Sequence, residues 1–272
     1  MKPTETSLFP PGKRLAMSVH FPVEWWSKPA DSEQMQANHE YGARFGARRL
    51  MDMFDRCGVR STSHLNGMVA ELFPDLVHEM ATRGHDIAAH GYDQNHPQSA
   101  MTEDEERATI RKALDTIEAA AGFRPKGWVA TGRKLNPWSV RLFAEAGILW
   151  HNHHDLSDLP RVVQVGDRKI VDCPVMAYMH FSDLRFIGGR PGETPKSCGE
   201  MLAFFKSQID ALRGAAQHEP LCFQFGAHAH ICGRPAYAWV VEEMIRYASS
   251  FDDVWWVTTG ELAERTLALS AA

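Results

Sequence analysis

Short apolar runs alternate with longer stretches of helical periodicity along most of this chain. Each run has the length of a buried strand, and the stretches between them repeat apolar residues every three or four positions. The runs span residues 15–21, 61–65, 85–90, 127–130, 148–153, 221–228 and 254–258. Strands that alternate with helices favour a parallel sheet, so the pattern predicts an α/β fold, specifically an irregular (β/α) barrel.

The helices between these runs carry their own start and stop signals. They are expected over residues 41–57, 72–82, 102–121, 137–147, 198–214, 236–249 and 261–269. The clearest follows Thr102, which can cap the helix while Glu105 completes a capping box. Residues 162–175 indicate an antiparallel ribbon that turns at Gly166. No linker or repeat interrupts the pattern, so residues 1–272 are expected to form one barrel domain, with an irregular N-terminal segment over 1–13.

Composition narrows the class of protein. A chain of 272 residues, of which 44% are hydrophobic, can bury a large core. Its net charge of −5, without a run of basic residues, argues against nucleic acid or a membrane surface as a partner. The five cysteines are irregularly spaced, as is typical of reduced thiols, and the N-terminus lacks the apolar core of a signal peptide. We therefore expect a cytoplasmic protein.

The first expected strand is followed by a candidate catalytic carboxylate. The working residues of a (β/α) barrel lie at the carboxyl ends of its strands, and here Glu24 stands after His20 and directly before Trp25 and Trp26. Two neighbouring indoles would desolvate the carboxyl group and raise its pKa toward the range of a general base or acid. The alternative is a solvated Glu24, with the tryptophans covering the barrel.

The third expected strand ends in His90, and a polar run over residues 93–96 follows it. His90 could ligate a metal or polarise a substrate, with Gln94 lining the same pocket. The alternative is a buried histidine that only hydrogen-bonds to the backbone. A second metal ligand would fall four residues after the first, but position 94 holds glutamine, and the next imidazole is His96.

Three further groups of residues carry chemistry. Arg133 follows the fourth expected strand and offers a planar fork for a carboxylate or a developing oxyanion. His228 and His230 alternate at the end of the sixth, so at most one is expected to face the site, and His228 is the candidate acid. Asp183 and Arg185 could bracket a polar substrate or pair with each other.

Taken together, these segments resemble the polysaccharide deacetylase superfamily. The similar pieces read, in chain order, GHDIAAHGYDQN, FRPKGWVATGR, FAEAGILWHNHHDLSDLP, MHFSDLRF, FGAHAHICGRPA and FDDVWWVTTGELA, and they extend from about residue 15 to 265. The TGR piece at 131–133 and the SDLRF piece at 182–186 resemble the branch of allantoinases and cyclic amide or imide hydrolases in particular. The resemblance implies a distorted barrel with about seven parallel strands.

The chain departs from the superfamily at the metal site. The deacetylases end their first strand with two aspartates and complete a metal site with two histidines four residues apart. This chain has His20 and Pro22 at the first two positions and Gln94 in place of the second histidine. The allantoinase branch also lacks the full metal set, so the resemblance favours a metal-free enzyme. A divalent metal such as zinc would need a rebuilt set based on His20 and His90, with a further carboxylate or imidazole.

The sequence therefore predicts a hydrolase of carbon–nitrogen bonds other than peptide bonds, with a small cyclic amide, imide or ureide as substrate. Water would be activated by Glu24 or His20, and the leaving nitrogen would be protonated by His228. Arg133 together with His90 would steady the tetrahedral oxyanion.

Substrate binding is assigned to polar and aromatic side chains around these groups. The tryptophans would stack on a flat ring and exclude water, which strengthens polar contacts. The expected substrate contacts are His20, Trp25, Trp26, Gln94, Asp183 and Arg185.

Three other functions stay open at this point. One is a metal-dependent N-deacetylase of an amino sugar or acylated small molecule, which stoichiometric zinc would favour. Another is a non-catalytic binding protein on the same fold, which the missing acids would explain. A lyase or isomerase could use the same acid–base pairs. Members of the superfamily are often oligomeric, so the resemblance also implies a homo-oligomer.

Overall fold

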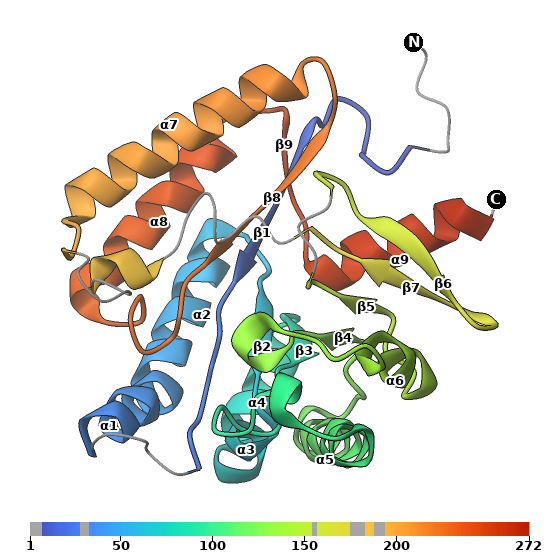
Figure 1. Ribbon diagram of the computed structural model, residues 1–272. Coiled ribbons are helices and arrows are strands. Elements are labelled where there is room, and N and C mark those ends of the chain that lie inside the picture. Colours follow the sequence, from blue (N-terminus) through green and yellow to red (C-terminus); the bar gives the residue numbers. More distant parts are fainter. Residues whose placement is uncertain (1–6, 28–32, 154–156, 175–182, 188–193, 272) are drawn as a thin grey trace.

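The computed structural model describes residues 7–27, 33–153, 157–174, 183–187 and 194–271. Its centre is one sheet, which in these residues has nine strands in the order β6-β7-β5-β4-β3-β2-β1-β8, with β9 beside β1 (Figure 1). The strands are β1 (Leu15–His20), β2 (Thr62–Leu65), β3 (Asp86–Ala89), β4 (Gly127–Trp128), β5 (Trp150–His151), β6 (Arg161–Val165), β7 (Arg168–Asp172), β8 (Leu221–Gly226) and β9 (Val254–Trp256).

Neighbouring strands pair in parallel except β6 and β7, which form an antiparallel hairpin. The predicted barrel-like α/β architecture is thereby confirmed. Each apolar run of the sequence contains a strand, and the predicted ribbon is the β6–β7 hairpin. Eight of the described strands have a parallel neighbour, in line with the expectation of about seven, and β7 is among them because it pairs in parallel with β5.

The longer helices lie on the outer side of the sheet (Figure 1). Both long capped helices have the reciprocal capping box, which confirms the prediction at Thr102 and adds a second box at Ser197. None of the described helices is long and apolar enough to cross a membrane. The α-helices are α1 (Glu33–Tyr41), α2 (Ala47–Cys57), α3 (Gly67–Leu72), α4 (Pro74–Thr82), α5 (Glu103–Ala121), α6 (Ser139–Glu145), α7 (Cys198–Ala216), α8 (Pro235–Ser249) and α9 (Thr259–Ala271).

Strand β1 lies inside the sheet, where it pairs with β2, β8 and β9, and its register fixes where these neighbours end relative to it. All its positions are buried, and β8 pairs with it from Leu15 to His20. His20 is in register with Gly226 at the end of β8 and with Thr62 in β2. A further parallel bridge joins Val23 to Leu65. The segments that follow β1, β2 and β8 therefore meet at one end of the sheet.

The helix expected over residues 41–57 begins earlier in the structure. Helix α1 already starts at Glu33, a π-helical segment (Gly42–Gly46) follows it, and α2 continues to Cys57. Gly58 then ends α2 in the left-handed conformation, with φ of 67°. The early start matters for the site, because it places His39 on a helix that faces the end of β8.

Close backbone contact between this helical region and the segment after β8 depends on glycine. A Cβ atom at Gly46 would lie 2.0 Å from the carbonyl oxygen of Ala229, and one at Gly42 would lie 2.9 Å from the backbone nitrogen of His230. Gly233 is equally crowded, since its Cβ would lie 2.2 Å from the Ala229 oxygen. Glycine at these positions allows the two backbones to touch, and His39, one helical turn before Gly42, is brought against His230.

Candidate active site

Glu24 is the centre of the candidate site, where its carboxylate is nearly buried at 12% exposure of the side chain. One oxygen, Oε1, lies 3.3 Å from His90 Nε2 and 3.4 Å from the amide nitrogen of Gln94. The other oxygen, Oε2, lies 3.9 Å from His228 Nε2. Residues that follow β1, β3 and β8 thus converge on a single carboxylate, as the placement at strand ends predicts.

Asn66, at the end of β2, ties these segments together. Its side-chain oxygen accepts hydrogen bonds from the Trp25 backbone amide at 2.8 Å and from Gln94 Nε2 at 3.3 Å. Its side-chain nitrogen donates to the carbonyl oxygen of His90. Because Asn66 is fully buried, these bonds hold the backbone on both sides of Glu24 in place.

The orientation of His90 follows from its second nitrogen. Nδ1 lies 2.8 Å from the carbonyl oxygen of Val129, which can only accept, so Nδ1 carries a proton and donates it. Nε2 consequently faces Glu24 Oε1 at 3.3 Å. His90 therefore orients Glu24 through a hydrogen bond.

His228 is held by a buried carboxylate. Its Nδ1 donates to Asp183 Oδ1 at 2.8 Å, its backbone amide donates to Asp183 Oδ2 at 2.5 Å, and the Cys232 thiol donates to the same Oδ2 at 3.4 Å. Burial opposes protonation of His228, but the negative charges of Asp183 and Glu24 outweigh it and raise its pKa to about 9. His228 is thus an imidazolium at neutral pH, with its Nε2–H directed to the Glu24 side.

The charge of Glu24 follows from these neighbours. Burial alone would raise the pKa of the Glu24 carboxyl, but the charge of His228 and the hydrogen bond with His90 hold that pKa well below its usual range. The pKa rise expected from flanking indoles is therefore wrong. Glu24 is an anion at neutral pH because histidines, and not only tryptophans, surround it.

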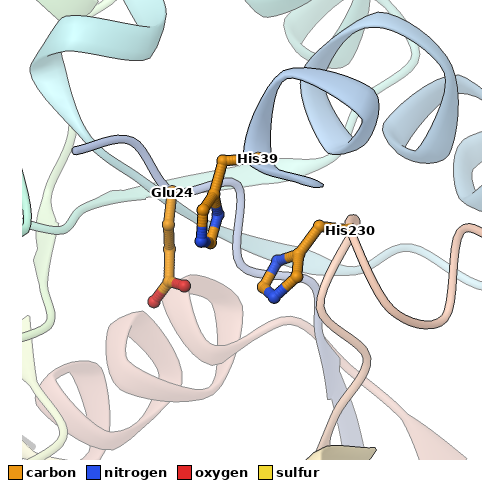
Figure 2. A group of neighbouring side chains, drawn as sticks. All are labelled: Glu24, His39 and His230. Carbon is orange, nitrogen blue, oxygen red and sulfur yellow. The ribbon is translucent and has the colours of Figure 1, made fainter. Parts of the chain in front are cut away.

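His230 and His39 are neutral, in contrast to His228. Burial and the nearby His39 and His228 lower the pKa of His230 to about 3, and burial lowers that of His39 to about 4. Their rings lie 4.2 Å apart, centroid to centroid, and Trp26 packs against His39 at 4.1 Å in a tilted arrangement. Figure 2 shows the two imidazoles and the Glu24 carboxylate turned toward one another from three different segments.

The expectation that only one of His228 and His230 faces the site is wrong. It assumes that the strand continues through both residues, whereas β8 ends at Gly226. The backbone amides of Ile231 and Cys232 donate to the carbonyl oxygen of His228, so the chain turns there. The turn places the two rings 5.5 Å apart, on the same side as Glu24.

Two expected substrate contacts have other partners. Asp183 is 1% exposed and is occupied by His228 and Cys232, so it positions His228 instead of meeting a substrate. His20 is 3% exposed, and its Nε2 hydrogen-bonds to Thr259 Oγ1 at 2.9 Å. Neither side chain has the exposure that a substrate contact needs.

The remaining predicted contacts differ in exposure. Trp25 is buried against Phe73 at 5.5 Å, whereas Trp26 is half-buried. Gln94 is half-buried beside Glu24. The side chains of Arg133 and Arg185 lie outside the described part of the structure.

The positions that carry metal in the deacetylases do not fit a metal here. His20 is bonded to Thr259, Pro22 has no side-chain ligand, and Gln94 donates its amide nitrogen to Glu24. Of the deacetylase metal set only His90 is retained, and catalytic zinc takes three ligands from the protein. His96 cannot complete the set, because its exposed ring is bonded to Asp93.

Sequence reasoning missed three residues of the site. Asn66 carries no motif, and His39 lies in a segment that reads as a polar loop. His230 was set aside by the alternation rule. No local pattern distinguishes these residues. Asn66 acts through contacts with the segments after β1 and β3, and His39 and His230 meet only where α1 contacts the turn after β8.

Comparison with known proteins agrees with the fold. Residues 32–149 match the polysaccharide deacetylase family model. A peptidoglycan deacetylase from Helicobacter pylori is 23% identical over 255 aligned residues, which cover 82% of this chain and 84% of the relative. A Mycobacterium smegmatis protein assigned to the polysaccharide deacetylases has a structure 26% identical, with a TM-score of 0.86, that covers 96% of this chain and 93% of its own.

Puue allantoinase has the same backbone architecture. Its structure is 24% identical, has a TM-score of 0.86 and covers 98% of this chain and 94% of its own. The family match, together with structures that cover nearly the whole chain, supports the polysaccharide deacetylase superfamily that the motifs predict, and Puue allantoinase shares the backbone fold. The chain therefore has the fold of hydrolases that act on carbon–nitrogen bonds of amides.

Proposed function

We propose that the protein opens a small cyclic amide, imide or ureide by hydrolysis of a carbon–nitrogen bond. The observation that carries the proposal is the pairing of an anionic Glu24 with a cationic His228 across 3.9 Å. This distance is too long for a direct hydrogen bond, so both groups can hydrogen-bond to a reacting molecule. Both are also partly exposed, at 12% and 18% of their side chains.

In the proposed reaction, Glu24 orients a water molecule and accepts its proton as the water oxygen attacks the carbonyl carbon. The tetrahedral intermediate then collapses, and its carbon–nitrogen bond breaks. His228 Nε2–H donates its proton to the departing nitrogen, which stays attached to the product of a ring opening. Asp183 keeps His228 protonated and oriented for this step, and His90 orients Glu24. Arg133 stays the predicted donor to the oxyanion.

The resemblance of the TGR and SDLRF pieces to the allantoinase branch supports a cyclic substrate. A second candidate is hydrolysis of an N-acetyl group, which the Helicobacter pylori peptidoglycan deacetylase supports because the match covers most of both chains. The metal positions of the deacetylases are replaced here, so ring opening is the better-supported reaction.

A substrate panel tests the proposal. Cyclic amides, imides and ureides, together with N-acetylated amino sugars, are incubated with the protein, and ring opening and acetate release are measured separately. We expect ring opening only, and a loss of at least about a hundredfold in Glu24→Gln, because proton transfer by a positioned group contributes about 10²–10⁴. His78→Gln, at an exposed helix position, is the control. Full turnover in Glu24→Gln, or acetate release alone, would contradict the proposal.

The pH dependence adds an independent criterion. His228 must be protonated to act as the acid, so the rate should fall as pH rises through its pKa of about 9. Glu24 stays ionised across the accessible range, because its pKa is well below the usual value. We therefore expect an alkaline limb in the rate profile, and no acid limb caused by Glu24.

A further inference from the structure

Glu24, His39 and His230 form a group of potential metal ligands that lies apart from the deacetylase metal positions (Figure 2). One ligand atom from each residue lies within 4.8 Å of the other two. Glu24 follows β1, His39 lies in α1, and His230 lies in the turn after β8. Among the described residues, these three potential ligands lie close enough together to share one metal ion. His20 and His90 are not part of the group.

The hydrogen bonding of this group is incomplete, as expected for ligands without their ion. His39 is 6% exposed, and its Nδ1 is buried without a hydrogen-bond partner in the described part of the chain. Buried polar atoms nearly always have a partner, and an exception needs a specific explanation. Glu24 Oε1 contacts His90 and Gln94, whereas Oε2 lies 3.9 Å from His228 Nε2, beyond hydrogen-bond distance.

The chemistry of the donors is right for a transition metal. Metal binding requires an ionised carboxylate and neutral imidazoles. Glu24 offers a carboxylate oxygen, and His39 and His230 each offer an imidazole nitrogen. Two imidazoles and one carboxylate are a common catalytic set for zinc, which keeps a fourth position open.

The required movement is small. Three ligands at zinc bond lengths of about 2.0–2.1 Å in tetrahedral geometry lie about 3.4 Å from one another. The ligand atoms, which now lie within 4.8 Å of one another, would therefore have to approach by at most about 1.4 Å. The backbones that carry His39 and His230 are already in contact through Gly42 and Gly46, which keeps the two ligands at a set separation.

We infer that Glu24, His39 and His230 bind one divalent first-row transition-metal ion of the zinc type. The site replaces the deacetylase metal site, whose positions hold His20, Pro22 and Gln94, with ligands from two segments that the deacetylase set does not use. An ion bound there would supply a Lewis acid beside His228. The inference goes beyond the proposed ring opening, and metal binding is measured without any substrate.

The test begins with the wild-type protein, purified without an affinity tag and analysed for metals. After treatment with a chelator, it is titrated with Co²⁺ and followed by ligand-field absorption, and Zn²⁺ is then used to displace the cobalt. We expect a single ion per chain, with a tetrahedral or five-coordinate spectrum that zinc removes. A wild-type protein that binds neither ion would overturn the inference, whatever its activity on cyclic amides.

Variants locate the ion. Loss of a residue that only supports a metal ligand typically weakens metal affinity by about 10–100-fold, and loss of a ligand should weaken it at least as much. His39→Gln and His230→Phe should therefore each weaken Co²⁺ binding by at least about a hundredfold. His90→Gln, which removes only a partner of Glu24, should weaken it by about tenfold at most. His78→Gln, exposed on α4, should leave it unchanged.

Two results keep this experiment decisive. Unfolding of each chelated variant is compared with the chelated wild type, and Glu24→Gln serves as a third ligand variant if a histidine variant does not fold. Binding that survives in His39→Gln and His230→Phe but is lost in His90→Gln would place the ion at the deacetylase position and reject the site. If metal binds as expected but no cyclic substrate is opened, the proposed function fails while the metal site stands.

Discussion

His228 and His230 lie two residues apart beside the same carboxylate, yet their pKa values differ in opposite directions from the usual one. The pKa of His228 is raised to about 9, and that of His230 is lowered to about 3. Burial lowers both, so burial does not explain the difference. The cause is the second neighbour: His228 donates to the buried Asp183, whereas His230 packs on the neutral ring of His39. One side of Glu24 is therefore built to hold a proton, and the other to offer a lone pair.

The largest expected effect comes from removal of the negative charge of Asp183, which distinguishes the His228 side of Glu24 from the His230 side. Asp183→Asn keeps the shape of the side chain but leaves His228 without its main stabilising charge, so the His228 pKa should fall below neutral. Turnover on a ring-opening substrate at neutral pH should drop on the order of a thousandfold, the middle of the range for a general acid. NMR titration of the His228 ring measures the first effect and steady-state kinetics the second.

The control for this variant is Asp167→Asn, at the exposed turn between β6 and β7. It removes the same charge far from the site and should change neither quantity. A His228 pKa that stays near 9 in Asp183→Asn would show that Asp183 does not set the charge of this side.

The free energy of unfolding should also depend on pH in two ways, one caused by His39 and His230 and the other by His228. His39 and His230 have folded pKa values below the unfolded value of about 6.5, so the unfolded chain binds more protons and stability falls as pH drops from about 6.5 toward 4. For His39 alone, the shift to about 4 corresponds to about 3 kcal/mol. His228 has the opposite sign: its contribution is complete below about 6.5 and is lost as pH rises through 9.

Urea unfolding between pH 4.5 and 9 measures both limbs. His230→Phe should flatten part of the acid limb and leave the alkaline limb intact, while Asp183→Asn should flatten only the alkaline limb. His85, buried with a pKa of about 4, keeps its share of the acid limb in both variants. If the free energy of unfolding falls equally steeply with decreasing pH in wild type and His230→Phe, His230 does not titrate as its contacts require.

The smallest expected effect concerns the backbone contact that joins the two sides. Gly46→Ala would place a Cβ 2.0 Å from the carbonyl oxygen of Ala229, so α2 and the turn after β8 must separate. We expect a loss of about 2 kcal/mol in unfolding free energy, as for other overpacked positions, together with a rise in the His230 pKa as His39 moves away. Gly214→Ala, in α7 with open space around it, should be neutral or slightly stabilising. An unchanged Gly46→Ala protein would reject the close contact.

Much of the fold could be read from local patterns, because strands and helices impose their own periods on apolar residues. The buried runs that became β1, β3 and β8, and the capping box at Thr102, depend only on residues a few positions apart. The same reasoning placed Glu24, His90 and His228 at strand ends, and the structure brings these three together. It failed at His230, because the alternation of a strand does not extend into the turn that follows.

The sequence by itself determined the parallel α/β architecture, the superfamily and the segments whose ends carry Glu24, His90 and His228. Only the tertiary structure decided which of these groups are charged and which residues complete the site. Asp183 is 45 positions from His228, and His39 is far from His230 in the chain, yet each pair is in contact in the fold. Protonation depends on distance and on removal from water, and neither quantity exists until segments remote in sequence pack together.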